Sequence, residues 1–307
     1  MSVLCLGETL VDLFCERPVA DFAQADAFVP HSGGAPANAA VVASRCGTRT
    51  SLGSGVGDDA WGRWLHARLA AEGVGLDWFT SVPGLRTPLA FVVVNERAEP
   101  DFAIYGDDIE AGLLSLDDRL EEAVMRHDAV LIGSNTLLGA RERALTLRVR
   151  EMVLAAGKHL FFDPNIRGAR WGDAGEAVRL VSDVLRGAAL LKVNRTEAEL
   201  LTGVADPAAA AERLVEMGAE LVAVTLGPQG AVLRGAACAD APGIPAKTVD
   251  TTGAGDVVTG VLVAALSIGD HSAEAAAAAL PIAVEAAARA TEGWGAIDAL
   301  PNAIALS

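Results

Sequence analysis

The chain has 307 residues, of which 51% are hydrophobic, and a formal net charge of −16 at pH 7. This length is sufficient for one large α/β domain or two smaller ones. The negative charge argues against nucleic acid or an anionic membrane surface as a partner, so an anionic ligand would need local positive groups or backbone dipoles.

The cysteines and histidines give no sign of a disulfide framework or a zinc site. The four cysteines are scattered without a Cys-x-x-Cys pair, and the five histidines have no metal-binding spacing. Neither a charged-then-apolar leader nor an apolar run of membrane-spanning length occurs. We therefore expect a cytoplasmic protein with reduced thiols.

Short apolar runs alternate with amphipathic stretches over most of the chain. The apolar runs predict buried strands at residues 3–7, 129–133, 160–163, 189–193 and 221–226. The stretches between them predict helices at residues 36–46, 59–72, 140–156, 174–185, 207–217, 255–267 and 272–291, the last kinked or split at Pro281. This alternation implies a mostly parallel sheet with helices on both faces. We expect a single three-layer α/β/α domain over residues 1–307.

Two regions, at about residues 10–30 and 86–106, interrupt this alternation. They contain strand-like pieces at residues 89–95 and 102–105 without a helix of normal length between them. We expect a small β-sheet that projects from the main sheet, as a lid over the site or a dimer contact. The alternative is two long surface loops.

The most informative segment is Asp250-Thr251-Thr252-Gly253-Ala254-Gly255-Asp256, which precedes an apolar run typical of a helix. Glycines that open a helix expose unpaired N–H groups at its positive end, where anions bind. The carboxylate of Asp256 would lie in the first turn, where the helix N-terminus should keep it ionised. An anion site beside a base is what phosphoryl transfer to a hydroxyl needs. The alternative is an ordinary glycine-rich turn capped by Asp.

Two clusters near the N-terminus suit a ligand with several hydroxyl groups. In the segment Ser32–Asn38, Gly33 and Gly34 let such a ligand approach the backbone, and Asn38 offers a donor and an acceptor. Asp12 follows the first strand, where ligands of open α/β sheets lie. Each has a structural alternative, since Gly-Gly before Pro and Asp after a strand are both common in turns.

Two further clusters suit a nucleotide and its metal ion. Glu197 lies in Asn194-Arg195-Thr196-Glu197, directly after a predicted strand, and can hold Mg²⁺ through the water shell of the ion. A helix cap formed by Asn194 and Glu197 is the alternative, and both roles are compatible. Thr225, Gly227 and Gly230 lie where a strand enters a Gly-Pro turn, which suits ribose and phosphates over bare backbone or, alternatively, is a plain β-turn.

A last cluster, Asp163-Pro164-Asn165-Ile166-Arg167, brings a guanidinium that can bind a carboxylate, a phosphate or sugar oxygens. A structural salt bridge within the loop is the alternative. Other nucleotide-binding patterns are missing: no Gly-x-x-x-x-Gly-Lys-Ser/Thr loop occurs, and Gly7 is the only glycine directly after the first strand. That single glycine disfavours a nicotinamide-dependent oxidoreductase.

In order and spacing, these clusters resemble the ribokinase (PfkB) family of carbohydrate kinases over nearly the whole chain. Gly33–Asn38 resembles the N-terminal motif of that family, Asp250–Asp256 resembles the C-terminal motif, and Asn194-x-x-Glu197 matches its Asn-x-x-Glu motif. The resemblance implies a ribokinase-like fold with a β lid. It also implies ATP-dependent phosphorylation of a sugar hydroxyl with Mg²⁺, K⁺ in many members, and a homodimer formed through the lid.

The same resemblance implies roles for individual residues. Asp256 would be the base, and the amides of Gly253, Ala254 and Gly255 would form the anion site. The implied sugar contacts are Asp12, Gly33, Gly34, Asn38, Tyr105 and Arg167. The implied nucleotide contacts are Asn194, Thr225, Gly227, Gly230, Gly253 and Gly255. The implied metal contacts are Glu197 for Mg²⁺ through water, and the carbonyls of Asp250 and Thr252 for K⁺.

Within the family, Asp163-Pro164-Asn165-x-Arg167 followed by Trp171 is similar to the fructokinase and 2-keto-3-deoxygluconate kinase branch. That branch commonly carries Arg after the aromatic residue of a lid strand, whereas here Gly106, Asp107 and Asp108 follow Tyr105. The lost positive charge favours a neutral ketohexose over an anionic sugar acid.

Three other functions remain open alternatives. The chain could phosphorylate 2-keto-3-deoxygluconate, or it could be another small-molecule kinase of the family that acts on ribose or a nucleoside. A non-catalytic sugar or nucleotide sensor on the same fold is the third, although a sensor has no need of the carboxylates of Asp256 and Glu197.

Overall fold

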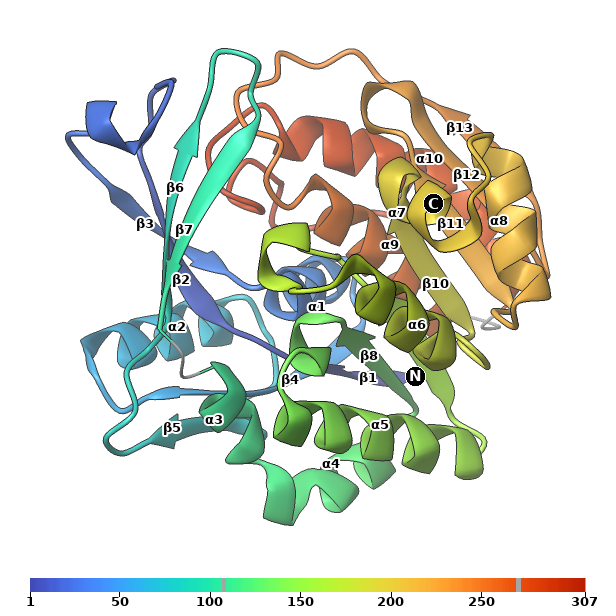
Figure 1. Ribbon diagram of the computed structural model, residues 1–307, viewed down its shortest axis with the longest axis horizontal. Helices are drawn as coiled ribbons and strands as arrows, with labels where there is room; N and C mark the ends of the chain where they lie inside the picture. The colour runs from blue at the N-terminus through green and yellow to red at the C-terminus, as the bar shows by residue number, and fades with distance from the viewer. Residues whose placement is uncertain (107–108, 269–271, 307) are drawn as a thin grey trace.

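A sheet of nine strands forms the centre of the fold in the computed structural model, which describes residues 1–106, 109–268 and 272–306. The strands lie in the order β13-β12-β11-β10-β9-β8-β1-β4-β5 (Figure 1). Seven are parallel, whereas β12 and β13 form an antiparallel edge. Their bounds are β1 (Ser2–Leu6), β4 (Arg49–Gly57), β5 (Phe79–Val82), β8 (Ala129–Gly133), β9 (His159–Asp163), β10 (Leu190–Asn194), β11 (Leu221–Thr225), β12 (Gly230–Gly235) and β13 (Ala239–Pro242).

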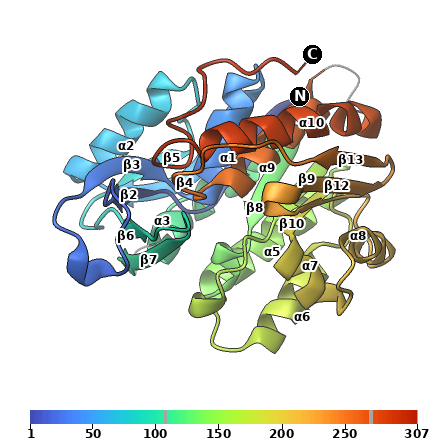
Figure 2. The same ribbon diagram turned by 90° about the horizontal axis from the view of Figure 1, so that it is seen from above.

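Helices cover both faces of this sheet, because alternate side chains of each strand point to opposite sides. In β1, Val3 and Cys5 join one buried apolar cluster, whereas Leu4 and Leu6 join another. The first cluster is covered by α1 (Ala35–Arg45), α2 (Ala60–Ala71), α9 (Ala254–Ser267) and α10 (Ala273–Ala290). The second is covered by α3 (Ile109–Leu114), α4 (Leu120–Arg126), α5 (Ala140–Ala155), α6 (Ala174–Val184), α7 (Arg195–Thr202) and α8 (Pro207–Glu216). Figure 2 shows the resulting layers, and the predicted three-layer α/β/α architecture is confirmed.

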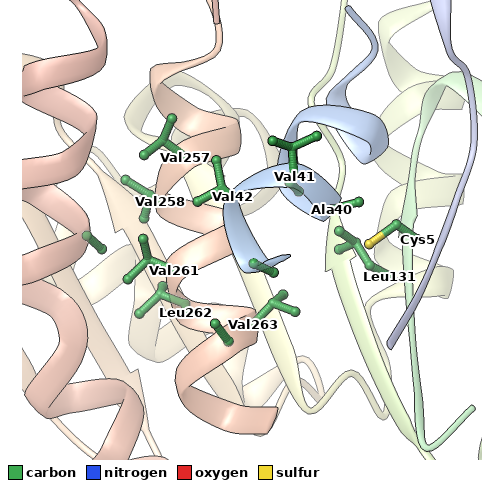
Figure 3. Packing of buried hydrophobic residues seen from close by; sticks show 14 of the residues in the cluster. Cys5, Ala40, Val41, Val42, Leu131, Val257, Val258, Val261, Leu262 and Val263 are labelled. Carbon is green, nitrogen blue, oxygen red and sulfur yellow. The ribbon is translucent and has the colours of Figure 1, made fainter. Parts of the chain in front are cut away.

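Helix α9 is buried along almost its whole length, so its position relative to the sheet is firmly fixed. Its Val257, Val258 and Val261 pack against Val42 of α1, and Cys5 of β1 lies on the other side of α1 beside Leu131 (Figure 3). At Gly260 a side chain would overlap Val42, so glycine is needed where the two helices cross. The N-terminus of α9, which carries the 253–256 segment, is therefore held by the core itself.

A second, four-stranded sheet with the order β3-β2-β6-β7 projects beside the main one (Figure 1). Its strands are β2 (Leu10–Phe14), β3 (Val29–Gly33), β6 (Leu89–Val94) and β7 (Pro100–Tyr105). This confirms the small β-sheet expected from residues 10–30 and 86–106, and we call these four strands the lid. The alternative of two long surface loops is wrong.

The lid is fastened to the core at two places. In the turn between β6 and β7, the carbonyl of Ala98 accepts hydrogen bonds from the amide and the hydroxyl of Thr251, at 3.2 and 3.0 Å. On β3, the ring of His31 is hydrogen-bonded to Asp298 near the C-terminus and to Glu16. The lid hairpin is thus directly attached to the 250–256 segment.

Several features of the main domain differ from the sequence-based expectations, which did not include strands β5, β12 and β13 or helices α3, α4 and α7. The α10 helix runs without interruption through Pro281 and is not split there. Strand β4 was not predicted, because its sequence Ser51-Leu52-Gly53-Ser54-Gly55-Val56-Gly57 looks like a loop. A side chain at Gly55 would overlap the carbonyl of Gly112 in α3, so glycine there allows a helix to approach the strand closely.

The strand order reverses direction between β1 and β8, which pair with each other. The chain passes from β1 to β4 on one side and later returns to β8 on the other. In open α/β sheets the crevice at the carboxyl ends of strands at such a reversal is the usual ligand site. Within the described ranges, no helix is both long and apolar enough to cross a membrane.

Candidate active site

The N-terminus of α9 carries unpaired backbone amides at the carboxyl edge of the sheet. Its N-cap is Gly253, with a left-handed φ of 72°, and a side chain at this position would also overlap Ala296. Within the described part of the chain, no acceptor meets the amides of Gly253, Gly255 and Asp256, and the amide of Ala254 makes only a 3.4 Å bond to Thr251. These donors, together with the helix dipole, form an anion site.

Asp256 lies in the first turn of α9 and is only 6% exposed. One carboxylate oxygen accepts a 2.8 Å hydrogen bond from the amide of Asn38, and the other a 3.4 Å bond from Asn165. Burial raises the pKa of Asp256, the charge of Asp163 adds to the rise, and Lys192 opposes it. This rise in pKa opposes the effect of the helix N-terminus, which was expected to keep the group ionised.

Of the residues predicted to hold an acceptor, Asp12, Gly33 and Gly34 lie together. Asp12 on β2 is buried. A side chain at Gly33 would overlap the carboxylate of Asp12, and one at Gly34 would overlap the carbonyl of Glu8. Burial raises the pKa of Asp12 to about 7, with a further contribution from the charge of Asp256. The two glycines are thus needed because backbone and carboxylate approach each other closely here.

Two other predicted acceptor contacts, Arg167 and Tyr105, are more exposed than Asp12. Arg167 is exposed, its guanidinium lies 5.2 Å from the ring centre of Phe102 in β7, and it forms no salt bridge within the described residues. The alternative of a structural salt bridge for Arg167 is therefore not supported. Tyr105 is 62% exposed and packs against Phe91, on the opposite face of the lid from Asp12 by strand register. The structure does not bring Tyr105 together with the other acceptor residues, and residues 107–108, which follow it, lie outside the described ranges.

The predicted nucleotide contacts lie at the carboxyl ends of β10 and β11. Asn194 and Thr225 end these parallel strands and are paired in register. Gly227 and Gly230 follow in the turn to β12, both with left-handed backbones, φ 59° and 98°. Around Gly227 no atom occupies the space of a side chain, so bare backbone faces outward there. The β-turn alternative and a nucleotide surface are both compatible with this geometry.

Glu197 serves as a helix cap, as the alternative interpretation expected. The side chain of Asn194 accepts from the amide of Glu197 at 2.9 Å, and Glu197 Oε2 accepts from the amide of Asn194 at 2.8 Å. Its Oε1 accepts from the amide of Ile166 at 2.6 Å. No cluster of three carboxylate, His or Cys side chains able to hold a metal occurs among the described residues. The single carboxylate of Glu197 fits a Mg²⁺ ion that keeps most of its water and phosphate ligands.

The carbonyl groups proposed for K⁺ are available. In the part of the chain that the structure describes, no donor meets the carbonyl oxygens of Asp250 and Thr252. The buried side chain of Asp250 instead accepts from the amide and hydroxyl of Thr252, at 2.9 and 2.7 Å. This holds the loop in a fixed shape, and its free carbonyl oxygens fit a weakly hydrated cation.

Lys192 is a residue of this site that sequence reasoning missed. It lies on β10, is 4% exposed, and its Nζ is 3.1 Å from Asp163 Oδ2, which also accepts from the hydroxyl of Thr259 at 2.6 Å. A side chain at Gly255 would meet this Nζ at 2.6 Å, so the ammonium lies directly beside the anion site. Neighbouring carboxylates raise the pKa of Lys192 although burial lowers it. A single Lys inside the apolar run 189–193 is the signal that could have identified it.

Comparisons with known proteins agree with this geometry. A family model described as pfkB family carbohydrate kinase matches residues 1–303. Fructokinase-1 of Zea mays is 34% identical over 267 residues, which cover 85% of this chain and 81% of that protein. The crystal structure of fructokinase from Vibrio cholerae O395 with fructose, ADP and calcium ion matches with a TM-score of 0.81 and 27% identity, over 98% of this chain and 96% of that one. The putative ribokinase II of E. coli, in complex with ATP and Mg²⁺, matches with a TM-score of 0.84 and 26% identity over the same shares.

Proposed function

Since the chain belongs to the pfkB family of carbohydrate kinases and is an ATP-dependent sugar kinase, we propose that its acceptor is a neutral ketohexose such as fructose. The fructokinases among its relatives support this choice, as does the neighbour that was crystallised with fructose. The buried carboxylates of Asp12 and Asp256 on the acceptor side also disfavour an anionic sugar.

The observation that carries the mechanism is the position of Asp256 in the first turn of α9, beside unpaired amides. Asp256 accepts the proton of the attacking hydroxyl as the γ-phosphoryl group is transferred in line from ATP. The amides of Gly253 and Gly255 stabilise the charge on that group, with Ala254 as a weaker donor. Asn38 and Asn165 fix the orientation of the carboxylate by hydrogen bonds.

The remaining predicted residues take supporting roles in this proposal. Asp12, Gly33, Gly34 and Asn38 bind sugar hydroxyls, and Arg167 closes the acceptor side against the lid. The nucleotide lies over Asn194, Thr225, Gly227 and Gly230. Glu197 would hold Mg²⁺ through water, and this ion neutralises phosphate charge when bound. The carbonyls of Asp250 and Thr252 would hold K⁺.

We also propose a cytoplasmic homodimer that forms through the lid. Its outer strands, β3 and β7, are the edges of the four-stranded sheet. They carry three of the exposed large apolar side chains, Val29, Ile104 and Tyr105. Unpaired strand edges with apolar side chains favour pairing with a second sheet.

The proposed acceptor is tested by a coupled ADP-release assay with different sugars. We expect kcat/KM for fructose to exceed that for 2-keto-3-deoxygluconate by roughly 10², because like charges placed together cost several kcal/mol. Ribose and nucleosides complete the series, and reactions without acceptor give the background. A preference for the sugar acid would assign the chain to the alternative branch, and no turnover with any acceptor would favour the sensor.

Sugar binding should depend on the ionisation of Asp12. A carboxylate accepts hydrogen bonds from hydroxyls through both oxygens only when ionised, and the pKa of Asp12 is raised to about 7. The KM for fructose should therefore rise by up to about tenfold for each pH unit below about 7. Steady-state kinetics from about pH 5.5 to about 8.5 measure this dependence around the raised pKa.

The variant Asp12→Asn provides the control for this pH dependence. Its KM should be high at every pH, with the dependence near pH 7 gone. Folded Asp12 binds its proton more tightly than the unfolded chain does, where the ordinary pKa is 3.8. The free energy of unfolding should therefore fall as the pH rises from about 4 to about 7, and less so in the variant. An unchanged KM profile in the variant would contradict the assignment.

A further inference from the structure

A cluster of polar side chains lies at the reversal point between β1 and β8, next to the acceptor side. Glu8 follows β1, and Ser134 and Asn135 follow β8, its direct neighbour in the sheet. None of these residues was predicted to take part in the site. They lie where the topology of an open α/β sheet places a ligand.

Hydrogen bonds fix the cluster and leave one carboxylate oxygen without a partner. The amide nitrogen of Asn135 donates to Glu8 Oε1 at 2.7 Å, and the amide oxygen of Asn135 accepts from Arg170 at 3.3 Å. A carboxylate on one side and a guanidinium on the other determine which way this amide points. Glu8 is 6% exposed and Ser134 is fully buried, yet Glu8 Oε2 and Ser134 Oγ have no hydrogen-bond partner.

These two orphan atoms belong to side chains that line a small cavity. Its volume is about 10 Å³, room for about one water-sized oxygen. Pro36 of α1 and Asn165 also line it, and Asn165 donates to Asp256. The cavity is therefore separated from the proposed catalytic carboxylate by one side chain. A buried carboxylate oxygen without a donor is costly, so a donor such as a water molecule or a ligand hydroxyl would complete the site.

We propose that Glu8 recognises one hydroxyl group of the sugar, which donates a hydrogen bond to Oε2 within this cavity. Ser134 Oγ provides a second partner for the same oxygen atom. The inference rests on the proposed function, because it requires a polyhydroxylated acceptor. It deepens that function, since a carboxylate at this point selects a neutral sugar with a hydroxyl in the right position and disfavours a carboxylate there.

The burial of Glu8 suits it to distinguish a sugar that carries the recognised hydroxyl from an analogue that lacks it. Burial raises the pKa of Glu8, while the hydrogen bond from Asn135 and the charge of Arg170 lower it. A site built to bind a hydroxyl rejects an analogue that lacks it far more strongly than an apolar pocket rejects a missing methylene. Loss of one hydrogen bond to a charged group typically corresponds to roughly 10- to 150-fold in affinity.

The test compares fructose with the monodeoxy fructoses that each lack one non-reacting hydroxyl, in the wild type and in Glu8→Gln. In the wild type, one of these analogues should lose roughly 10- to 150-fold in kcat/KM relative to fructose. In Glu8→Gln the same analogue should lose less than about threefold, while the KM for ATP stays unchanged. This loss of discrimination against one analogue is an effect that a merely structural role would not produce.

Glu142→Gln is the matched control, since Glu142 is also buried and accepts a 2.7 Å bond from the amide of Gly139 at the start of α5. It should lower stability and leave the preference among analogues unchanged. Should Glu8→Gln not fold, Ser134→Ala is used, and it should weaken discrimination against the same analogue by severalfold.

Unchanged preferences in the folded variants would show that the cavity holds only a water molecule and would overturn the inference. A wild type that phosphorylates no fructose would instead contradict the proposed function. The two failures are thus distinguishable.

Discussion

Replacement of Asp256 by Asn should lower kcat by about 10² or more while the Kd for ATP remains almost unchanged. Asn has the same size and keeps an oxygen for the 2.8 Å bond from Asn38, but it cannot take the proton of the attacking hydroxyl. The amides of Gly253 and Gly255 are untouched, so ATP still binds. Coupled ADP release measures kcat, and calorimetric titration with ATP and Mg²⁺ measures Kd.

The control for this prediction is Asp117→Asn, which removes an exposed carboxylate paired with Arg148. It should leave both kcat and Kd at their wild-type values.

Since burial raises the pKa of Asp256, the fall of kcat at acid pH should lie above the ordinary pKa of 3.8 in the wild type. An Asp256→Asn protein with turnover near that of the wild type would disprove the assignment of the base.

Replacement of Lys192 by Met should lower the free energy of unfolding by roughly 3–5 kcal/mol, the usual cost of removing one partner of a buried ion pair. The 3.1 Å contact to Asp163 is the reason, because the variant leaves a buried carboxylate without its cation. The KM for ATP should rise as well, since a positive charge beside Gly255 is lost. Urea denaturation and steady-state kinetics at saturating sugar measure the two effects.

The double variant Lys192→Met with Asp163→Asn separates the two effects. It should regain much of the lost stability, because no uncompensated charge remains, yet its KM for ATP should stay high. Lys247→Met removes an exposed lysine and serves as the control for a Lys-to-Met change. A single variant with wild-type stability would show that Lys192 and Asp163 do not form the pair described.

The layered architecture could be predicted because it depends on local patterns. In β1 the apolar run predicts a strand buried on both sides, and the structure places Val3 and Leu4 in the two different clusters. Strand β4 escaped prediction for a tertiary reason. Gly55 is required by the close approach of α3, which lies more than 50 residues away in sequence, whereas local propensity favours a loop.

The candidate site also contains residues that local sequence patterns identify and residues that only tertiary contacts reveal. Motifs with strict local geometry, such as the left-handed Gly253 and the capping pair Asn194 and Glu197, could be identified from their spacing. Lys192 and Glu8 were missed, because their importance comes from partners distant in sequence, Asp163 at the end of β9 and Asn135 after β8. The Lys inside the apolar run 189–193 indicates a buried position but not the carboxylate that pairs with it, whereas a Glu that follows a strand gives no sign of burial.

The attachment of Thr251 to Ala98 has a consequence for the catalytic cycle. A lid that swings away to admit the sugar would have to break both hydrogen bonds, which would leave Thr251 without its contact to the lid. Movement of the lid would thus act on the backbone just before the N-terminus of α9, while the helix itself stays packed in the core.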